Sequence, residues 1–337
     1  MKKLWIVAAA AVVLLAVPLF FAARFFIDRK LPGFSRSLEV YVYPDDSPAS
    51  VLDSILAQGA VLSEGSLRRA FRSAGASESV QPGHYTVAPS SSTMYLARML
   101  RHGWQTPVSL TLSGSIRSRG VLARKIGAQM MVDSVDVAST LNSPEFLEAH
   151  GTDTTLLFTK IIPETYSIKW SEGPDAIVER LFKEADSWWT PERLARASAQ
   201  GLTREQVSTL ASIVDGESHY APELPRIAGV YLNRLRTGML LQADPTVAYC
   251  FGYSLKRVLL RHLEYDSPYN TYKYKGLPPG PISCPPVVCL EAVLGAERHD
   301  YLYFCASPSL DGTHLFASSY EQHLRNARAF QSALSKR

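Results

Sequence analysis

An uncharged run at residues 4–23 places the strongest constraint on how this chain folds. About 20 apolar residues in a helix are long enough to cross the ~30 Å hydrocarbon core of a bilayer. Lys2 and Lys3 precede the run and favour a cytoplasmic N-terminus, because positive charge is retained on that side. We therefore expect a single-pass transmembrane helix within residues 1–30, held in an inner membrane, with the rest of the chain in the periplasm.

A cleaved signal peptide is the alternative interpretation of this run. The run is long for the apolar part of a signal peptide. Phe20, Phe21 and residues 24–26 also offer no small-residue cleavage site. These two features favour an uncleaved anchor.

The net charge of +4, from 35 basic and 31 acidic residues, argues against a nucleic-acid partner, and the chain has no dense basic run. The four cysteines lie in the last third of the chain without a Cys-x-x-Cys zinc pattern, and they are Cys250, Cys284, Cys289 and Cys305. Their spacing leaves both free thiols and disulfide bonds open.

Hydrophobic periodicity predicts an α+β protein with a small module at 38–105 and a larger domain at 106–337, whose core is 201–337. The module is expected to have the order β-α-α-β-α, with strands at 38–42 and 84–87 and helices at 48–58, 64–73 and 92–102. Residues 31–37 are expected to be a linker. The stretch 251–286 is rich in Tyr, Pro, Gly and Asn, and a loop of this length is usually functional.

The helix expected before Glu217 carries the main candidate site. Thr203 and Gln206 form a capping-box pattern at its start. Four apolar residues then share one helix face: Val207, Leu210, Ala211 and Val214. Glu217 continues this face, whereas Asp215 lies two residues away and points elsewhere, so the two acids are not a facing pair.

A carboxyl group on an apolar face loses hydration, which raises its pKa. A raised pKa makes Glu217 a candidate proton donor near neutral pH. Gly216 is expected to let the backbone approach a ligand. The structural alternative is that Glu217 pairs with Arg226 or caps the next helix.

A second helix is expected from Pro222 to Thr237, ending before Gly238. Four of its residues are expected to pack inward: Ile227, Val230, Tyr231 and Leu235. The segment 241–246 is expected to be a polar turn. Gln242 and Asp244 in this turn are candidates to hydrogen-bond sugar hydroxyls, or they only build the turn.

Several blocks resemble the YceG-like (MltG) endolytic murein transglycosylases: 211–217, 233–239, 241–249, 267–272, 276–282 and 301–304. The resemblance extends to 38–105, which is similar to the family's LysM-like module and includes Pro82-Gly83-His84-Tyr85. It implies a membrane-anchored lyase that needs no cofactor or metal and cuts the bond between N-acetylmuramic acid and N-acetylglucosamine. It also implies that Glu217 is catalytic. The candidates to position the substrate are Asn233, Gln242, Asp244, Tyr269, Asn270 and Tyr272, and structural packing is the alternative role for Tyr269 and Tyr272.

The chain departs from the family pattern at two places. The first acid of the 211–217 block is usually Glu in the family, and here it is Asp215. Around Pro163 the family's Glu-Gly is replaced by Phe158-Thr159, and an Asp is replaced by Glu164. The roles of Asp215 and Glu164 are therefore left open.

The resemblance implies that Glu217 protonates the glycosidic oxygen and then accepts the proton of the muramyl C6 hydroxyl, which leaves a 1,6-anhydro end. Three alternatives are a water-using muramidase of the lysozyme type, a non-catalytic wall-binding or scaffold protein, and a metalloenzyme. The metalloenzyme would use His219, His262, His299, His314 and His323, but these histidines show no ligand spacing. An anchored enzyme is also expected to meet peptidoglycan synthases at the membrane.

Overall fold

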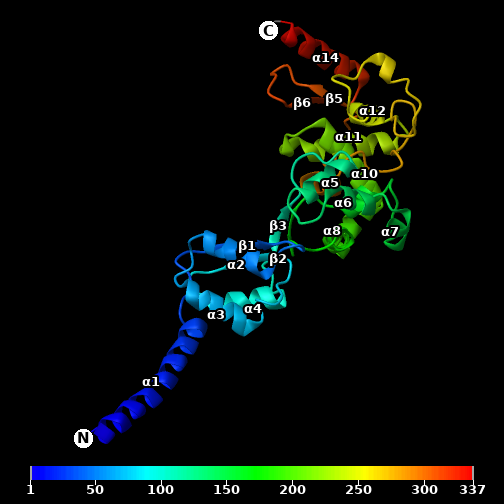
Figure 1. Ribbon diagram of the computed structural model, residues 1–337. Helices are drawn as coiled ribbons and strands as arrows, with labels where there is room; N and C mark the ends of the chain where they lie inside the picture. The colour runs from blue at the N-terminus through cyan, green and yellow to red at the C-terminus, as the bar shows by residue number, and fades with distance from the viewer. Residues whose placement is uncertain (1, 336–337) are drawn as a thin grey trace. The chain divides into compact units, whose positions relative to one another are not determined.

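The computed structural model describes the backbone of residues 2–335 and the side chains of residue 5 and residues 12–335. Helices and short strands both occur, so the expected α+β class is confirmed (Figure 1). Contacts divide the chain into two units. The first comprises 1–110, 129–132 and 166–172, and the second comprises the remainder. The expected boundary at 105 does not account for the two short segments that join the first unit.

The first unit has the β-α-α-β-α order expected from the sequence, preceded by one helix. Its elements are α1 (Lys2–Lys30), β1 (Leu38–Val42), α2 (Pro48–Ala57), α3 (Glu64–Ala74), β2 (Gly83–Val87) and α4 (Thr93–His102). Strands β1 and β2 pair antiparallel, with Tyr41 opposite His84. Apolar side chains from both strands and from α2, α3 and α4 form one buried core.

Local signals in the sequence explain where these helices begin and end. The hydroxyls of Ser47, Ser63 and Ser92 each accept a hydrogen bond from a backbone N–H three residues later, which caps α2, α3 and α4. Helices α3 and α4 end at Gly75 and Gly103, whose positive φ angles of 75° and 67° close the last turn.

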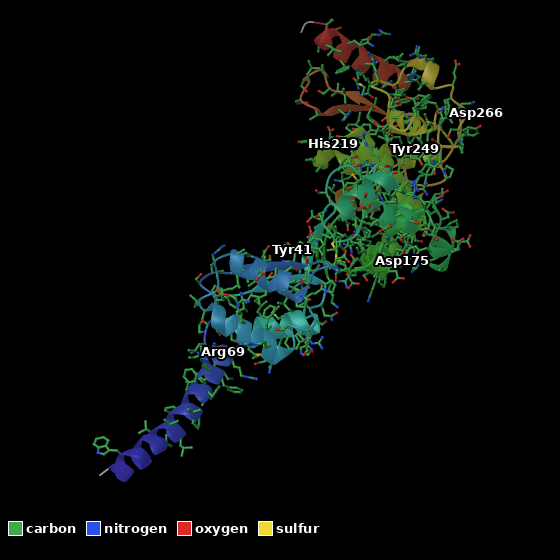
Figure 2. The ribbon with its side chains drawn as sticks, viewed as in Figure 1. Tyr41, Arg69, Asp175, His219, Tyr249 and Asp266 are labelled. Carbon is green, nitrogen blue, oxygen red and sulfur yellow. The ribbon has the colours of Figure 1, made fainter. Side chains whose placement is uncertain are left out.

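The buried carboxylate of Asp28 fixes the C-terminal end of α1 to α3 within the first unit. Arg69 on α3 donates two hydrogen bonds to Asp28, at 2.9 and 2.8 Å, and Ser66 donates a third at 2.5 Å (Figure 2). Burial raises the pKa of Asp28, but the bonds from Arg69 and Ser66 outweigh it and hold that pKa below its usual value. Phe34 is also buried, so the expected linker at 31–37 is a packed segment.

Within the part of the chain that the structure describes, no helix combines the length and the apolarity that a membrane crossing requires. The expected span at 4–23 begins among residues whose side chains lie outside the described part. From Val12 to Phe26, α1 nevertheless carries large apolar side chains that are exposed.

The remaining elements belong to the second unit or, for β3 and β4, cross the boundary between the units. They are β3 (Val108–Thr111), α5 (Arg119–Gly127), α6 (Ser134–Thr140), α7 (Pro144–Ala149), η1 (Leu157–Lys160), β4 (Thr165–Ile168), α8 (Pro174–Trp188), α9 (Pro191–Ala199), α10 (Arg204–Glu217), η2 (Ala221–Glu223), α11 (Leu224–Arg236), α12 (Asp244–Cys250), η3 (Leu260–His262), α13 (Val287–Leu294), β5 (Tyr303–Ala306), β6 (His314–Ala317) and α14 (Tyr320–Leu334). Helices α10, α11 and α13 pack on one another around the main apolar core of this unit.

Two expected elements of the second unit are wrong in detail. The helix expected at 222–237 is split into η2 and α11, because Pro222 and Pro225 each start a new helical turn. The polar turn expected at 241–246 ends in helix α12, in which Pro245 occupies the first turn, where a missing N–H costs nothing.

Candidate active site

Glu217 is the last residue of α10, and its carboxyl group contacts α11. The expected capping box at Thr203 and Gln206 is present and fixes the start of α10. The apolar face of this helix is buried, and Glu217 ends it in a half-buried position. The hydroxyl of Tyr231 on α11 donates a 2.6 Å hydrogen bond to Oε1 of Glu217.

Burial raises the pKa of Glu217 from 4.5 to about 7. The hydrogen bond from Tyr231 and the charge of Arg234 favour the ionised form and oppose this rise, whereas the charge of Asp244 adds to it. The expected upward shift is therefore confirmed. At neutral pH the group is close to half protonated, which suits a proton donor that must later accept a proton.

The structural alternatives for Glu217 are wrong. Arg226 forms its ion pair with Glu297, at 2.9 Å. Helix α11 begins without a side-chain cap, so Glu217 does not cap it. The carboxyl group of Glu217 is held by a tyrosine instead of by a cation.

Gly216 permits a close contact that differs from the expected one. A Cβ atom at this position would lie 2.5 Å from Cβ of Pro245 and 2.6 Å from its Cγ. The missing side chain therefore lets α10 pack against the first turn of α12, whereas we expected it to make room for a ligand. This packing brings Asp244 near Glu217.

Three cavities are lined in part by residues 215–219, at the end of α10. A cavity of about 270 Å³ is lined by Glu217, Asp215 and Asp244 among others. A second, of about 660 Å³, is lined by Glu217 and His219 together with the β5–β6 hairpin and its loop. A third, of about 390 Å³, is lined by Asp215, His219 and Glu164. Because each cavity shares a lining residue with the other two, the three cavities adjoin at the end of α10, and Glu217 lines two of them.

A hydrogen-bonded pair of side chains lies beside Glu217. The hydroxyl of Tyr272 donates a 2.6 Å hydrogen bond to Asp244, and burial raises the pKa of Tyr272 far above its ordinary value. The backbone N–H groups of Gln242 and Ala243 donate to the carbonyl and hydroxyl of Thr271, respectively. These bonds fix the approach to α12 against the loop that carries Tyr272.

Comparison with known proteins identifies the family. The model of the YceG-like family matches residues 40–329. The chain belongs to the YceG-like family. An endolytic murein transglycosylase of Bacillus subtilis is 33% identical over 181 residues, which cover 52% of this chain and 49% of that protein. One of Streptococcus pneumoniae is 32% identical over 171 residues, covering 49% of this chain and 31% of that protein. The matches thus span half or less of these relatives.

A solved structure supports the same family. The crystal structure of a YceG-like protein from Listeria monocytogenes aligns with a TM-score of 0.56 and 26% sequence identity. The alignment covers 86% of this chain and 99% of that one. The similarity therefore extends beyond the segment shared with the two transglycosylases.

The other substrate-binding candidates occupy different positions in this YceG-like chain. Asn270 is completely buried and donates to the carbonyls of Leu263 and Tyr265, so it shapes the loop and has no surface for a sugar. Asn233 donates to the carbonyls of His299 and Tyr301. It lines a separate cavity of about 540 Å³, and Glu217 is not among the residues that line this cavity.

The two remaining candidates, Tyr269 and Gln242, are outside the residues that line the described cavities around Glu217. The ring of Tyr269 packs against Tyr249, with centroids 4.5 Å apart. Gln242 is exposed and has a φ of 50°, a left-handed conformation that is uncommon for residues other than glycine.

Two groups that affect the pKa of Glu217, Tyr231 and Arg234, were not predicted from the sequence. Tyr231 was expected only to pack inward, although a buried tyrosine hydroxyl usually requires a hydrogen-bond partner, and that rule could have identified it. Arg234 is buried and donates to the carbonyls of Leu241 and Leu302, so its charge stays close to the site. Its partner Leu302 lies 68 positions away, and no local pattern indicates this contact.

The structure also locates the histidines and cysteines. Among the described residues, no group of three or more metal-binding side chains comes together. His314 forms an ion-pair contact of 2.9 Å with Glu223, and His299 contacts the carbonyl of Arg226. All four cysteines are free, and burial raises the pKa of Cys289 to about 12.

Proposed function

We propose that this chain is an endolytic lytic transglycosylase that cuts the glycosidic bond between N-acetylmuramic acid and N-acetylglucosamine in peptidoglycan. The observation that carries the proposal is the half-buried Glu217, which has a pKa of about 7 and lines two adjoining cavities. The Bacillus and Streptococcus relatives, which are endolytic murein transglycosylases, support the same reaction class.

In the first step, protonated Glu217 gives its proton to the glycosidic oxygen. The bond between this oxygen and C1 of the muramyl sugar breaks, and the sugar develops oxocarbenium character. Tyr231 donates to Oε1, which leaves Oε2 to carry the proton toward the substrate. The departing sugar keeps the proton as its new hydroxyl group.

In the second step, the C6 hydroxyl of the muramyl sugar attacks C1. Its proton passes to the carboxylate of Glu217, which restores the acid and leaves a 1,6-anhydro end without adding water. One carboxyl group thus serves as acid and then as base. Its pKa of about 7 suits both roles, because neither form is strongly disfavoured at neutral pH.

Asp244 and Tyr272 are proposed to position the substrate beside Glu217. Asp244 lines the 270 Å³ cavity and is oriented by the hydroxyl of Tyr272. Its carboxylate accepts hydrogen bonds, so sugar hydroxyls are suitable donors to it. Gln242 and Tyr269 are proposed to act at the margin of the site, and Asn233 and Asn270 to keep its backbone in place.

We further propose that residues 4–23 anchor the chain in the inner membrane, with the second unit in the periplasm. The uncharged sequence supports this proposal, and so do the exposed apolar side chains of α1 between Val12 and Phe26. Residues 38–105, with their β-α-α-β-α order, are proposed to act as a LysM-like module. Peptidoglycan synthases at the membrane are the proposed protein partners.

The test is digestion of purified peptidoglycan by the chain without residues 1–23, in wild-type and Glu217→Gln forms, with mass analysis of the products. Wild-type protein is expected to release 1,6-anhydro-muropeptides. The mutant is expected to be about 100- to 10,000-fold slower, the usual contribution of a general acid. Undiminished release by the mutant would reject Glu217 as the acid.

Three other outcomes identify the alternatives. Products heavier by one water would indicate a muramidase that uses water as the nucleophile. Co-sedimentation with cell walls without any product would indicate a wall-binding protein. Product formation that is lost on treatment with a chelator would favour a metalloenzyme.

A further inference from the structure

The cavities around Glu217 differ in the charges that line them. The 270 Å³ cavity is lined by the cations Arg117, Lys256 and Arg257. The 660 Å³ and 390 Å³ cavities are lined by no lysine or arginine among the described residues. An anionic group on a bound polymer would therefore be attracted to one side of Glu217 only.

Two of these cations have no carboxylate partner in the described part of the chain. Lys256 and Arg257 are exposed at the cavity margin, and neither forms an ion pair there. Three acids line the same cavity, Asp215, Glu217 and Asp244, and none of them forms an ion pair with Lys256 or Arg257 in the described part of the chain. Asp244 accepts from Tyr272, and the carboxyl group of Glu217 is close to half protonated at neutral pH.

The third cation is fixed by a tyrosine. The guanidinium of Arg117 lies over the ring of Tyr253, 4.6 Å from its centroid. The hydroxyl of Tyr253 donates a 2.6 Å hydrogen bond to the carbonyl of Ile282, which fixes the ring. Tyr253 lies three residues before Lys256 in the chain. The contact of Arg117 with Tyr253 therefore places all three cations on the same side of the cavity.

Peptidoglycan offers a matching anion at a definite place. The muramyl sugar carries a short peptide on its lactyl group, and that peptide bears free carboxylates. Guanidinium groups bind carboxylates through two parallel hydrogen bonds, and lysine adds a point charge. Denuded glycan strands, from which the peptides have been removed, lack these carboxylates.

We propose that Arg117, Lys256 and Arg257 recognise the carboxylates of the stem peptide, so that the site prefers peptide-bearing glycan strands to denuded ones. This inference rests on the proposed function, and it assigns the substrate class of the same site. The cationic side of the cavity holds the peptide of the muramyl sugar, and Glu217 acts on the adjacent glycosidic bond.

The test compares cleavage of peptide-bearing strands with cleavage of strands denuded by an amidase. Wild-type protein is expected to prefer the peptide-bearing strands in kcat/KM. In Lys256→Gln/Arg257→Gln protein this preference should fall about tenfold, since each exposed charge pair contributes up to about fivefold. Lys273→Gln/Lys275→Gln removes two exposed lysines from the same long loop but outside the cavity, and should leave the preference unchanged.

A binding measurement separates this inference from the proposed reaction. In a Glu217→Gln background, affinity for peptide-bearing strands over denuded strands should fall by a similar factor when Lys256 and Arg257 are replaced. An unchanged preference in both measurements, or an equal fall with the control pair, would overturn the inference while leaving the reaction intact. Absence of cleavage of either strand by wild-type protein, with the binding preference retained, would instead overturn the reaction.

Discussion

The two sides of the site around Glu217 are built by different means. On one side, α10 and α11 bury an apolar face and end it with Glu217 and the hydroxyl of Tyr231. On the other side, α12 and the stretch 251–286 are held by hydrogen bonds between side chains and backbone. The helical side raises the pKa of Glu217 by removing water, and the loop side raises it through the charge of Asp244.

The difference shows that the pKa of Glu217 depends on two separate features: burial by the helices, and the position in which hydrogen bonds hold Asp244. Burial is a property of the whole helical core, so it resists single substitutions on the surface. The position of Asp244 depends on a few bonds made by Tyr272 and Thr271, so it is open to single substitutions.

The largest effect is expected on the loop side, from Asn270→Ala. This substitution leaves the carbonyls of Leu263 and Tyr265 and the backbone N–H of Tyr272 without their partner. The free energy of unfolding should fall by about 3–5 kcal/mol, since each of these part-buried groups costs about 1 kcal/mol or more when it is left unpaired. Denaturant unfolding measures the loss, and Ser254→Ala, which removes one exposed hydrogen bond, should change it little. A loss as small as that of Ser254→Ala would show that other contacts hold the loop.

The helical side could be predicted from the sequence, because its signals are local. The capping box at Thr203 and the periodic face that leads to Glu217 are both read within a few turns. On the loop side, the sequence identifies Asp244 and Tyr272 as candidates but does not reveal that they bond to each other. Their hydrogen bond joins residues 28 positions apart in the sequence. Asn270 was predicted to bind substrate because no local pattern in the sequence indicates that it is fully buried.

The next effect concerns the cost of keeping an acid on the helical side. A rise in the pKa of Glu217 from 4.5 to about 7 means that the native state binds more protons than the unfolded state between these values. Stability should therefore fall as the pH increases through this range. Glu217→Gln should raise the free energy of unfolding by roughly 3 kcal/mol at about pH 8 and by little at about pH 4.

Unfolding by denaturant at several pH values measures this gain. Glu264→Gln, at an exposed position, provides the matched control and should change the free energy of unfolding little. A gain from Glu217→Gln of equal size at both ends of the pH range would show that the carboxyl group is not penalised by burial.

A smaller effect is expected where the two sides meet, from Gly216→Ala. The new Cβ would lie about 2.5 Å from the side chain of Pro245, so α12 must move away from α10. Overpacking of this kind costs about 1–3 kcal/mol, which exceeds the gain of up to ~1 kcal/mol in helix propensity. At Gly65 on α3 the nearest atom is Nη1 of Arg69 at 3.4 Å, an ordinary contact distance, so Gly65→Ala should be neutral or stabilising. Thermal unfolding of both variants tests the contrast, and equal midpoints would refute it.

The smallest expected effect is a shift in pH dependence that has opposite signs on the two sides. Tyr231→Phe removes a hydrogen bond that favours the ionised form of Glu217, so its pKa should rise further. Asp244→Asn removes a nearby negative charge, so the pKa of Glu217 should fall. Because the first chemical step requires the protonated acid, the alkaline decline of kcat/KM should move to higher pH in Tyr231→Phe and to lower pH in Asp244→Asn. Shifts of the same sign, measured on one soluble glycan substrate, would show that the two sides do not control Glu217 separately.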